Sequence, residues 1–120
     1  MYHKSQKSMI VVLDRVATNE DIEKASEEYK TYVKVTIDVE KGIVAIGGEY
    51  HYDAEQELLK VGCKQEDIWG GGLDLLTKKI DTNAIINIRP QRNYSTEICD
   101  EYVRQKYFTI FKKYIPVQTS

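Results

Sequence analysis

The fold is decided by residues 33–53, VKVTIDVEKGIVAIGGEYHYD. Apolar and polar side chains alternate over 33–40, which predicts a strand with one face in solvent. The EKG sequence at 40–42 predicts a tight hairpin connection, in which Gly42 can adopt positive φ. The returning strand, 43–46, is apolar on both faces, so we expect it at the centre of a sheet that is covered on both sides.

The segments on either side of this hairpin predict an α+β fold. Strands are predicted at 9–13 and 84–89, with a short strand around Ile68-Trp69 beside a mobile turn at Gly70 to Gly72. Helices are predicted at 19–30 with a Thr18–Asp21 capping box, at 53–61 with Asp53 as cap, and at 97–114 with Ser95 or Thr96 as cap. This order matches a ferredoxin-like βαββαβ core with a long C-terminal helix. We expect two layers, helices on a mostly antiparallel sheet, and further cover on strand 43–46 from the last helix or a partner subunit.

Length and composition indicate one soluble domain at 9–115, with a disordered lead at 1–8 and a tail at 116–120. Hydrophobic residues make up 42% of the chain and charged residues 30%, and the net charge of -2 argues against a nucleic-acid-binding role. No apolar run approaches the ~20 residues that span a bilayer, and 1–8 lacks the apolar region of a signal peptide. We therefore expect a cytoplasmic protein with both cysteines reduced.

Glu49, His51 and Asp53 follow the glycine pair at a spacing of two residues. On an extended chain such residues share one face, which would bring one imidazole and two carboxylates together at the end of a strand. This set suits iron, manganese or zinc, and His51 with Glu49 also suits general acid–base catalysis. The alternative is structural, with Asp53 capping the next helix, Glu49 in solvent and His51 bonded to a neighbouring strand.

A second group of polar residues lies in and after the predicted strand 84–89. Arg89 and Arg92 are suited to an anionic ligand, because a guanidinium offers a bidentate fork to phosphate or carboxylate. Asn87, inside an apolar segment, needs a partner for its amide, which is either a ligand or a neighbouring loop. Trp69, beside three glycines, forms either the wall of a pocket or a cover of the core.

The segment DVEKGIVAIGGEYHYDAE, residues 38–55, resembles an uncharacterised family of small bacterial and archaeal proteins. The similarity continues through Gln65 and Trp69-Gly70 to INIRP at 86–90, and then to Asn93 and Ser95. It covers roughly residues 9–115 and implies a shared fold and a shared site, without an assigned activity. This chain departs from the family in its glycine-rich stretch after Trp69 and in Tyr94, where a basic residue is expected.

These residues together predict a domain that binds a small polar or anionic ligand. The predicted surface combines 47–53, 65–70 and 87–95, and its ligand-binding residues are Gln65, Trp69, Asn87, Arg89, Arg92 and Asn93. The alternative is a small hydrolase-like or metal-dependent enzyme that uses His51 and Glu49, with Asp53 as a further metal ligand. The sequence identifies no cofactor and is compatible with a homodimer.

Overall fold

The computed structural model describes residues 9–26 and 31–116. The predicted lead at 1–8, the end of the first predicted helix at 27–30 and the tail from 117 onward lie outside these residues. Helix α1, Asn19–Ala25, has the predicted capping box. Its Asp21 carboxylate accepts from the Thr18 N–H at 2.9 Å, and the Thr18 hydroxyl accepts from the Asp21 N–H at 3.1 Å.

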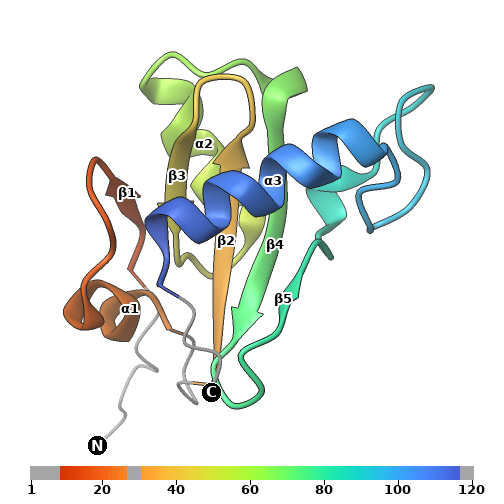
Figure 1. Ribbon diagram of the computed structural model, residues 1–120. Coiled ribbons are helices and arrows are strands. Elements are labelled where there is room, and N and C mark those ends of the chain that lie inside the picture. Colours follow the sequence, from red (N-terminus) through yellow and green to blue (C-terminus); the bar gives the residue numbers. More distant parts are fainter. Residues whose placement is uncertain (1–8, 27–30, 117–120) are drawn as a thin grey trace, which may run out of the picture.

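An antiparallel five-stranded sheet in the order β1-β3-β2-β4-β5 forms the centre of the molecule (Figure 1). The strands are β1 Val11–Leu13, β2 Tyr32–Asp38, β3 Ile43–Ile46, β4 Ile68–Asp74 and β5 Ile80–Asp81. The α+β class and the antiparallel sheet are thus confirmed. The order across the sheet differs from the interleaved βαβ units of a ferredoxin-like core, because β4 pairs with β2 while β1 pairs antiparallel with β3.

Helices cover both faces of this sheet, so the molecule has three layers where two were predicted. Helix α3, Glu101–Tyr114, crosses one face, and helix α2, His51–Lys60, lies on the other (Figure 1). Alternate strand residues separate into two clusters. The cluster under α3 includes Val33, Val35, Ile37, Val44, Ile46, Trp69, Tyr107 and Phe111. The cluster under α2 consists of Ala45, Ala54, Leu58, Cys63 and Ile68.

This arrangement confirms the prediction for β3, where Val44, Ala45 and Ile46 are all fully buried. It overturns the prediction that one face of β2 is in solvent. Thr36 and Asp38, on the polar face of β2, have no exposed surface. They are buried because α2 packs over the face that was expected to be wet.

The hairpin between β2 and β3 forms as predicted. Gly42 has a φ of +73°, which the left-handed region allows to glycine at little cost. The Asp38 carboxylate accepts from the N–H groups of Glu40 at 2.9 Å and Lys41 at 2.7 Å. One carboxylate oxygen therefore satisfies two donors of the turn.

The predicted mobile turn at Gly70 to Gly72 is wrong, because these glycines lie inside the seven-residue strand β4. All seven residues of β4 are in register with β2, from Ile68 opposite Asp38 to Asp74 opposite Tyr32. Because the glycines have no side chains, tyrosine side chains from other elements pack directly against the backbone of β4. A Cβ atom at Gly71 would lie 2.6 Å from the Tyr107 hydroxyl, and one at Gly72 would lie 2.0 Å from the Tyr32 hydroxyl.

Two further predicted elements differ from the structure. Residues 84–89 form no strand, and the short 3-10 helix η2, Ile85–Asn87, stands there with the Ile85 side chain 79% exposed. Helix α3 begins at Glu101, and Asp100 is its cap in place of Ser95 or Thr96. The Asp100 carboxylate accepts from the Val103 N–H at 3.1 Å.

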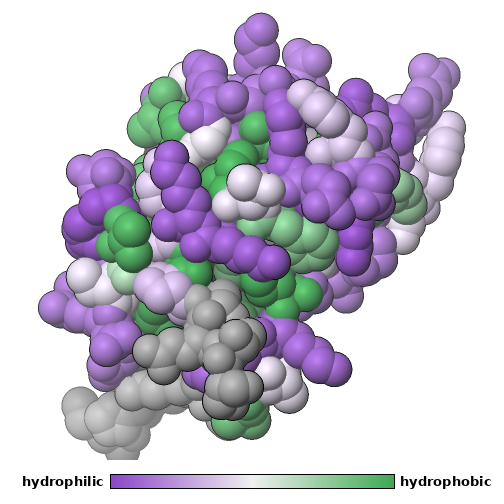
Figure 2. Space-filling model, viewed as in Figure 1, coloured by the Kyte–Doolittle hydropathy of each residue, from purple (hydrophilic) through white to green (hydrophobic). Residues whose placement is uncertain are grey.

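The side of the molecule that carries α3 is largely hydrophilic, with small hydrophobic patches (Figure 2). Within the described residues, no helix combines the length and the apolar character that crossing a membrane requires. Both cysteines, Cys63 and Cys99, are free thiols.

Candidate functional site

The outer edge of β4 is paired by side chains where β5 does not reach. The N–H and C=O groups of successive strand residues point to opposite sides of the strand. Because Gly72 pairs with Asp81 of β5, these groups point toward the β5 side at Gly72, Gly70 and Ile68. The Asn87 amide oxygen accepts from the Gly70 N–H at 2.8 Å, and its NH₂ group donates to the Gly70 carbonyl at 2.9 Å. The Asn87 carboxamide thus takes the place that the peptide group of another strand would occupy.

Arg89 continues this pairing along the same edge. Its guanidinium donates to the carbonyl oxygens of Ile68 and of Glu66, the latter at 2.9 Å, and its Nε donates to Ile86 at 3.2 Å. The guanidinium carbon lies 4.0 Å from the ring centre of Trp69, which is fully buried. The guanidinium of Arg89 therefore donates to backbone carbonyl groups. The Trp69 ring is part of the core, which was one of the two alternatives predicted for it.

Asn93 holds the loop that follows η2. Its NH₂ group lies 2.7–3.0 Å from the carbonyl oxygens of Asn87, Ser95 and Glu97, and its amide oxygen accepts from the Cys99 N–H at 3.1 Å. Asn93 is 2% exposed and Asn87 is fully buried. The structure therefore favours the loop-bonding alternative for Asn87, and Asn93 acts in the same way.

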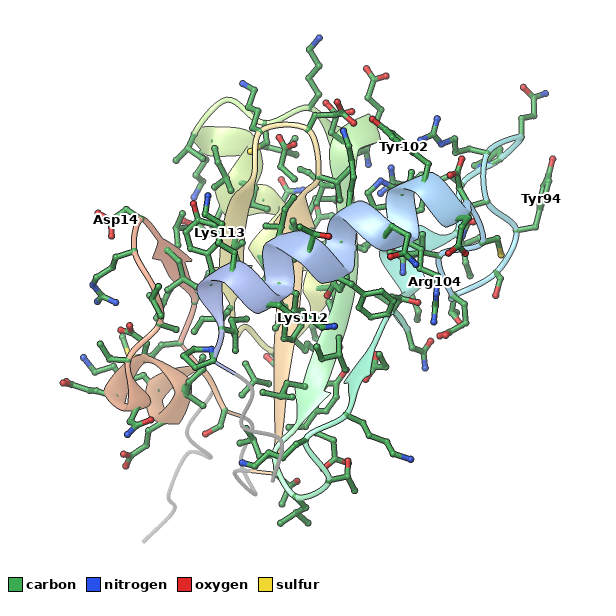
Figure 3. All side chains as sticks on the ribbon, in the orientation of Figure 1. Asp14, Tyr94, Tyr102, Arg104, Lys112 and Lys113 are labelled. Atoms are coloured by element: carbon green, nitrogen blue, oxygen red, sulfur yellow. The ribbon has the colours of Figure 1, made fainter. Side chains whose placement is uncertain are left out.

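The tip of this loop is in solvent. Tyr94 points away from the body of the molecule and is 79% exposed (Figure 3). Arg92 is exposed as well, with its guanidinium carbon 5.6 Å from the Trp69 ring centre. Of the two predicted anion-binding arginines, Arg92 is the one on the surface.

Glu49, His51 and Asp53 do not alternate along an extended chain, because α2 already begins at His51. Asp53 is the third helical residue rather than the cap, and its carboxylate accepts from the Tyr50 N–H at 3.2 Å. Glu49 is exposed before the helix. Among residues 9–26 and 31–116, no three His, Cys, Asp or Glu side chains are grouped so that they could hold a metal ion.

His51 lies against β4, as its structural alternative predicted. Its Nε2 is 2.7 Å from the Gly71 carbonyl oxygen. A Cβ atom at Gly70 would lie 2.8 Å from the imidazole and 2.7 Å from the Cβ of Ala84. The missing side chain at Gly70 is therefore what allows the imidazole and Ala84 to approach the strand.

Glu55 is a buried carboxylate that the sequence analysis did not identify. It is 3% exposed on the inner side of α2, one turn after His51. Burial raises the pKa of the Glu55 carboxyl, while the charge of Arg89 and a hydrogen bond from Gln65 lower it by less. The spacing of His51, Glu55 and the buried Leu58 along one helix face is the signal that could have revealed this position.

A cavity of about 630 Å³ opens between the start of α2 and the segment 83–86. Its described lining consists of Lys34, Tyr50, His51, Tyr52, Asn83, Ala84, Ile85 and Ile86. Only His51 among the predicted site residues lies there. Tyr50 and Tyr52 lie within the segment 47–53 of the predicted surface, whereas Lys34 and residues 83–86 were missed because they come from segments far away in the chain.

Both rims of this cavity expose apolar surface. Tyr50 is 63% exposed and Tyr52 59% on the α2 side, and Ile85 is 79% exposed on the opposite side. Lys34, from β2, is the cationic residue of the described lining, which contains no carboxylate. The first turn of α2 also lies at the cavity, and there the Asp53 carboxylate, which accepts from the Tyr50 N–H, offsets the positive end of the helix dipole.

Comparison with known proteins gives one match. A family model described as "Protein of unknown function (DUF5674)" matches residues 11–114. This match confirms the expected relationship to an uncharacterised family. Neither a curated protein nor a solved structure matches the chain.

Proposed function

This chain belongs to the DUF5674 family, and we propose that it binds a small organic anion in the cavity between α2 and the segment 83–86. The observation that carries the proposal is the cavity itself, whose described lining is largely apolar and includes one lysine, Lys34. Its volume of about 630 Å³ is typical of pockets that enclose a small molecule.

The chemistry of the lining favours an anion with an apolar body. The walls carry the side chains of Tyr50, Tyr52, Ile85 and Ile86, which offer apolar area and leave few polar partners for a sugar or a peptide backbone. Lys34 brings a cationic side chain to the lining. A ligand with one negatively charged end and one apolar end would therefore place its charge near Lys34 and its apolar part against the walls.

The exposed rims support occupancy by such a ligand. Covering apolar surface contributes about 25 cal/mol per Å² of area removed from water. Tyr50 and Ile85, on opposite sides, both leave more than half of their surface in solvent. A molecule that bridges them would bury this surface from both sides.

The test is a thermal-shift and calorimetry screen with aryl carboxylates, alkyl carboxylates and inorganic phosphate. We expect at least one organic anion to raise the melting temperature, since ligands that bind only the folded state stabilise it by mass action. Ile85→Glu should abolish the effect by placing a like charge at the rim. Leu76→Glu is the matched control, because Leu76 is 77% exposed and is not among the described lining residues.

A screen in which no organic anion changes the melting temperature would contradict the proposal. Equal binding by wild type and Ile85→Glu would contradict it too, because the ligand would then lie elsewhere. Binding that is lost in both Ile85→Glu and Leu76→Glu would point to a general effect of added charge and would also remove the cavity from consideration.

The hydrolase-like alternative gains no observation in its favour. Glu49 is exposed, and the described lining of the cavity includes His51 but no serine, cysteine or carboxylate. Burial is the largest cause that raises the pKa of the Cys63 thiol to about 12, and a hydrogen bond with Asp38 and the charge of Asp38 contribute to the same rise. That thiol is protonated at neutral pH and is a weak nucleophile.

Three earlier predictions about the protein's surroundings stay predictions. We place the protein in the cytoplasm, expect no affinity for nucleic acid because of the net charge of -2, and retain a homodimer as the partner arrangement. Light scattering over a hundredfold range of concentration tests the last of these, and a mass that stays at 13.9 kDa throughout would contradict it.

A further inference from the structure

We propose a second site, for a phosphate group, at the turn 89–93, between the guanidinium groups of Arg89 and Arg92. This site goes beyond the proposed function, because neither arginine is in the described lining of the cavity. Three observations carry the proposal: the tight turn that holds both arginines, the lack of an ion pair for either of them, and the surplus of hydrogen-bond donors around the Trp69 ring.

A tight turn brings the two side chains to the same aromatic ring. The Arg89 carbonyl accepts from the N–H groups of Arg92 at 3.2 Å and Asn93 at 3.0 Å, and the Asn93 carbonyl accepts from the Arg89 N–H at 2.7 Å. Inside the turn, Gln91 has a φ of +63°, which residues other than glycine seldom adopt. The guanidinium carbons of Arg89 and Arg92 lie 4.0 and 5.6 Å from the ring centre of Trp69. Two positive charges are therefore held around one ring.

Neither of these charges is neutralised by an ion pair. Within residues 9–26 and 31–116, no carboxylate forms a salt bridge with Arg89 or Arg92. Burial is the largest cause that lowers the pKa of Arg89, and the charge of Arg92 lowers it further, while the charges of two carboxylates, Glu55 and Asp67, act the other way. Arg92 is thus near enough to repel Arg89, and an anion bound between them would offset the repulsion.

Hydrogen-bond donors outnumber acceptors around the Trp69 ring. Each guanidinium nitrogen of Arg89 donates to one backbone carbonyl, and the second N–H on its two terminal nitrogens has no partner among the described residues. Arg92 contacts the ring and donates to no acceptor in the same part of the chain. The buried indole N–H of Trp69 also has no acceptor there. A group with several acceptor oxygens would satisfy donors from both arginines.

A phosphate group matches the two arginines better than a carboxylate does. A guanidinium presents its N–H groups as a planar fork, which pairs with two oxygens of one anion. A phosphate monoester has three terminal oxygens and nearly two negative charges at neutral pH, whereas a carboxylate has two oxygens and one charge. Two guanidinium groups are therefore matched by one phosphate, either as the free ion or as a small ester.

Calorimetry at about pH 8 with three probes tests the site, since the second ionisation of phosphate esters is then complete. Phenyl phosphate is compared with benzenesulfonate, which has the same three terminal oxygens but a single charge. We expect phenyl phosphate to bind about tenfold more tightly, because its second charge interacts with the second guanidinium. Amide chemical-shift changes should be largest at residues 89–93. Inorganic phosphate distinguishes the two sources, because binding weaker than that of phenyl phosphate would identify the ester and equal binding the phosphate group alone.

Arg92→Met removes the exposed guanidinium without removing a side-chain hydrogen bond of the described residues, so the variant should fold as the wild type does. It should lose most of the preference for phenyl phosphate over benzenesulfonate. Lys112→Met is the matched control, because it changes the net charge by the same amount toward the C-terminal end of α3, away from the turn (Figure 3). This control should keep the preference of the wild type.

Several results would overturn the inference. These are a wild type that binds no phosphate probe or binds the two phenyl probes equally, an undiminished preference in Arg92→Met, and equal losses in Arg92→Met and Lys112→Met. Chemical-shift changes at residues 50–52 and 83–86 that disappear in Ile85→Glu would overturn it too, because phenyl phosphate would then occupy the cavity. The proposed function is judged separately, since failure of the carboxylates to bind in an Ile85-dependent way would remove it and leave the site at Arg92 standing.

Discussion

Asn87 shows how a single side chain can complete a sheet. Its carboxamide has the same donor and acceptor as a peptide group, and both bond to Gly70 at the edge of β4. The NH₂ group is also 2.8 Å from the Thr82 carbonyl and 2.9 Å from that of Thr96. Two neighbouring loop segments are thereby bonded to the sheet by one residue, which explains why a polar side chain is fully buried in an apolar segment.

Asn87→Ala should lower the free energy of unfolding by about 2–4 kcal/mol, because it leaves buried backbone groups without partners. Urea denaturation followed by circular dichroism measures the change. Asn83→Ala is the matched control in the same loop, since Asn83 is exposed and its loss should change stability by less than about 0.5 kcal/mol. Equal effects of the two substitutions would contradict the assigned role of Asn87.

Glu55 should make stability depend on pH. Because burial raises the pKa of Glu55 in the folded state above its ordinary value of 4.5, the folded protein binds the proton more tightly than the unfolded chain. The free energy of unfolding therefore gains a contribution at low pH that is lost as pH rises from about 4.5 through the raised folded pKa.

Glu55→Gln removes this contribution. The stability of the wild type relative to Glu55→Gln should fall as pH rises from 4 to 7, and urea denaturation at several pH values within this range measures the difference. Glu57→Gln, on the same helix, is the matched control. Parallel pH profiles for wild type and Glu55→Gln would show that the buried carboxyl is not the source.

At the scale of the elements, the extent of β4 and the start of α3 depend on contacts with particular side chains. Three consecutive glycines are unfavourable in an isolated strand. In β4 they are required, because the side chains of His51, Tyr107 and Tyr32 occupy the space that their Cβ atoms would fill. Pairing with β2 along all seven residues keeps this segment extended.

Helix α3 begins where its cap is, and the cap is Asp100. Asp100→Ala should lower the free energy of unfolding by about 1 kcal/mol through loss of the bond from the Val103 N–H. Asp100→Asn keeps a capping oxygen and should retain most of the stability. Thermal and urea denaturation measure both, and an Asp100→Asn loss as large as that of Asp100→Ala would show that capping is not the cause.

At the scale of the whole molecule, the sheet lies between two hydrophobic clusters, and its strands contribute side chains to both of them. Val44 and Ile46 of β3 belong to the cluster under α3, while Ala45 between them belongs to the cluster under α2. If β3 left the sheet, side chains of both clusters would therefore be exposed to solvent. Tyr107 bonds α3 to the sheet within one of these clusters, since its hydroxyl donates to the Val35 carbonyl at 2.7 Å.

Both clusters should therefore unfold in a single transition. Leu58→Ala and Phe111→Ala, one in each cluster, should each lower the free energy of unfolding by about 2–5 kcal/mol. Trp69 fluorescence and far-ultraviolet circular dichroism should give coincident curves in both variants. Leu76→Ala, at an exposed position, is the control. Separate transitions from the two probes would contradict a shared core.

Some of this architecture follows from short stretches of sequence. The strand predicted from the alternation in β2, the apolar run of β3, the glycine of the hairpin and the Thr18–Asp21 capping box rest on local signals, and each was confirmed. The solvent-facing side predicted for β2 was wrong, because α2 covers it. The helix predicted at 97–114 forms over Glu101–Tyr114, with Val103, Tyr107 and Phe111 buried. In each case the residues that produce the signal are within a few positions of one another.

The candidate site depended on contacts between distant segments. The pattern singled out Asn87, Arg89 and His51 as chemically important, but it could not show that backbone groups of β4 are their partners. Glu55 and the cavity were missed because burial of a helix face, and space between α2 and residues 83–86, exist only after the chain has packed.

Local sequence specified which segments form the hairpin, α1 and most of α3, because hydrogen bonding along the backbone and apolar periodicity act over a few residues. Packing specified that β4 continues through Gly70 to Gly72, that residues 84–89 form no strand, and that Lys34, Tyr50 and Ile85 surround one cavity. The physical reason is that a glycine-rich strand depends for its stability on side chains from other elements that pack against it. The backbone groups at the edge of β4 depend likewise on hydrogen bonds from residues distant in sequence, such as Asn87 and Arg89.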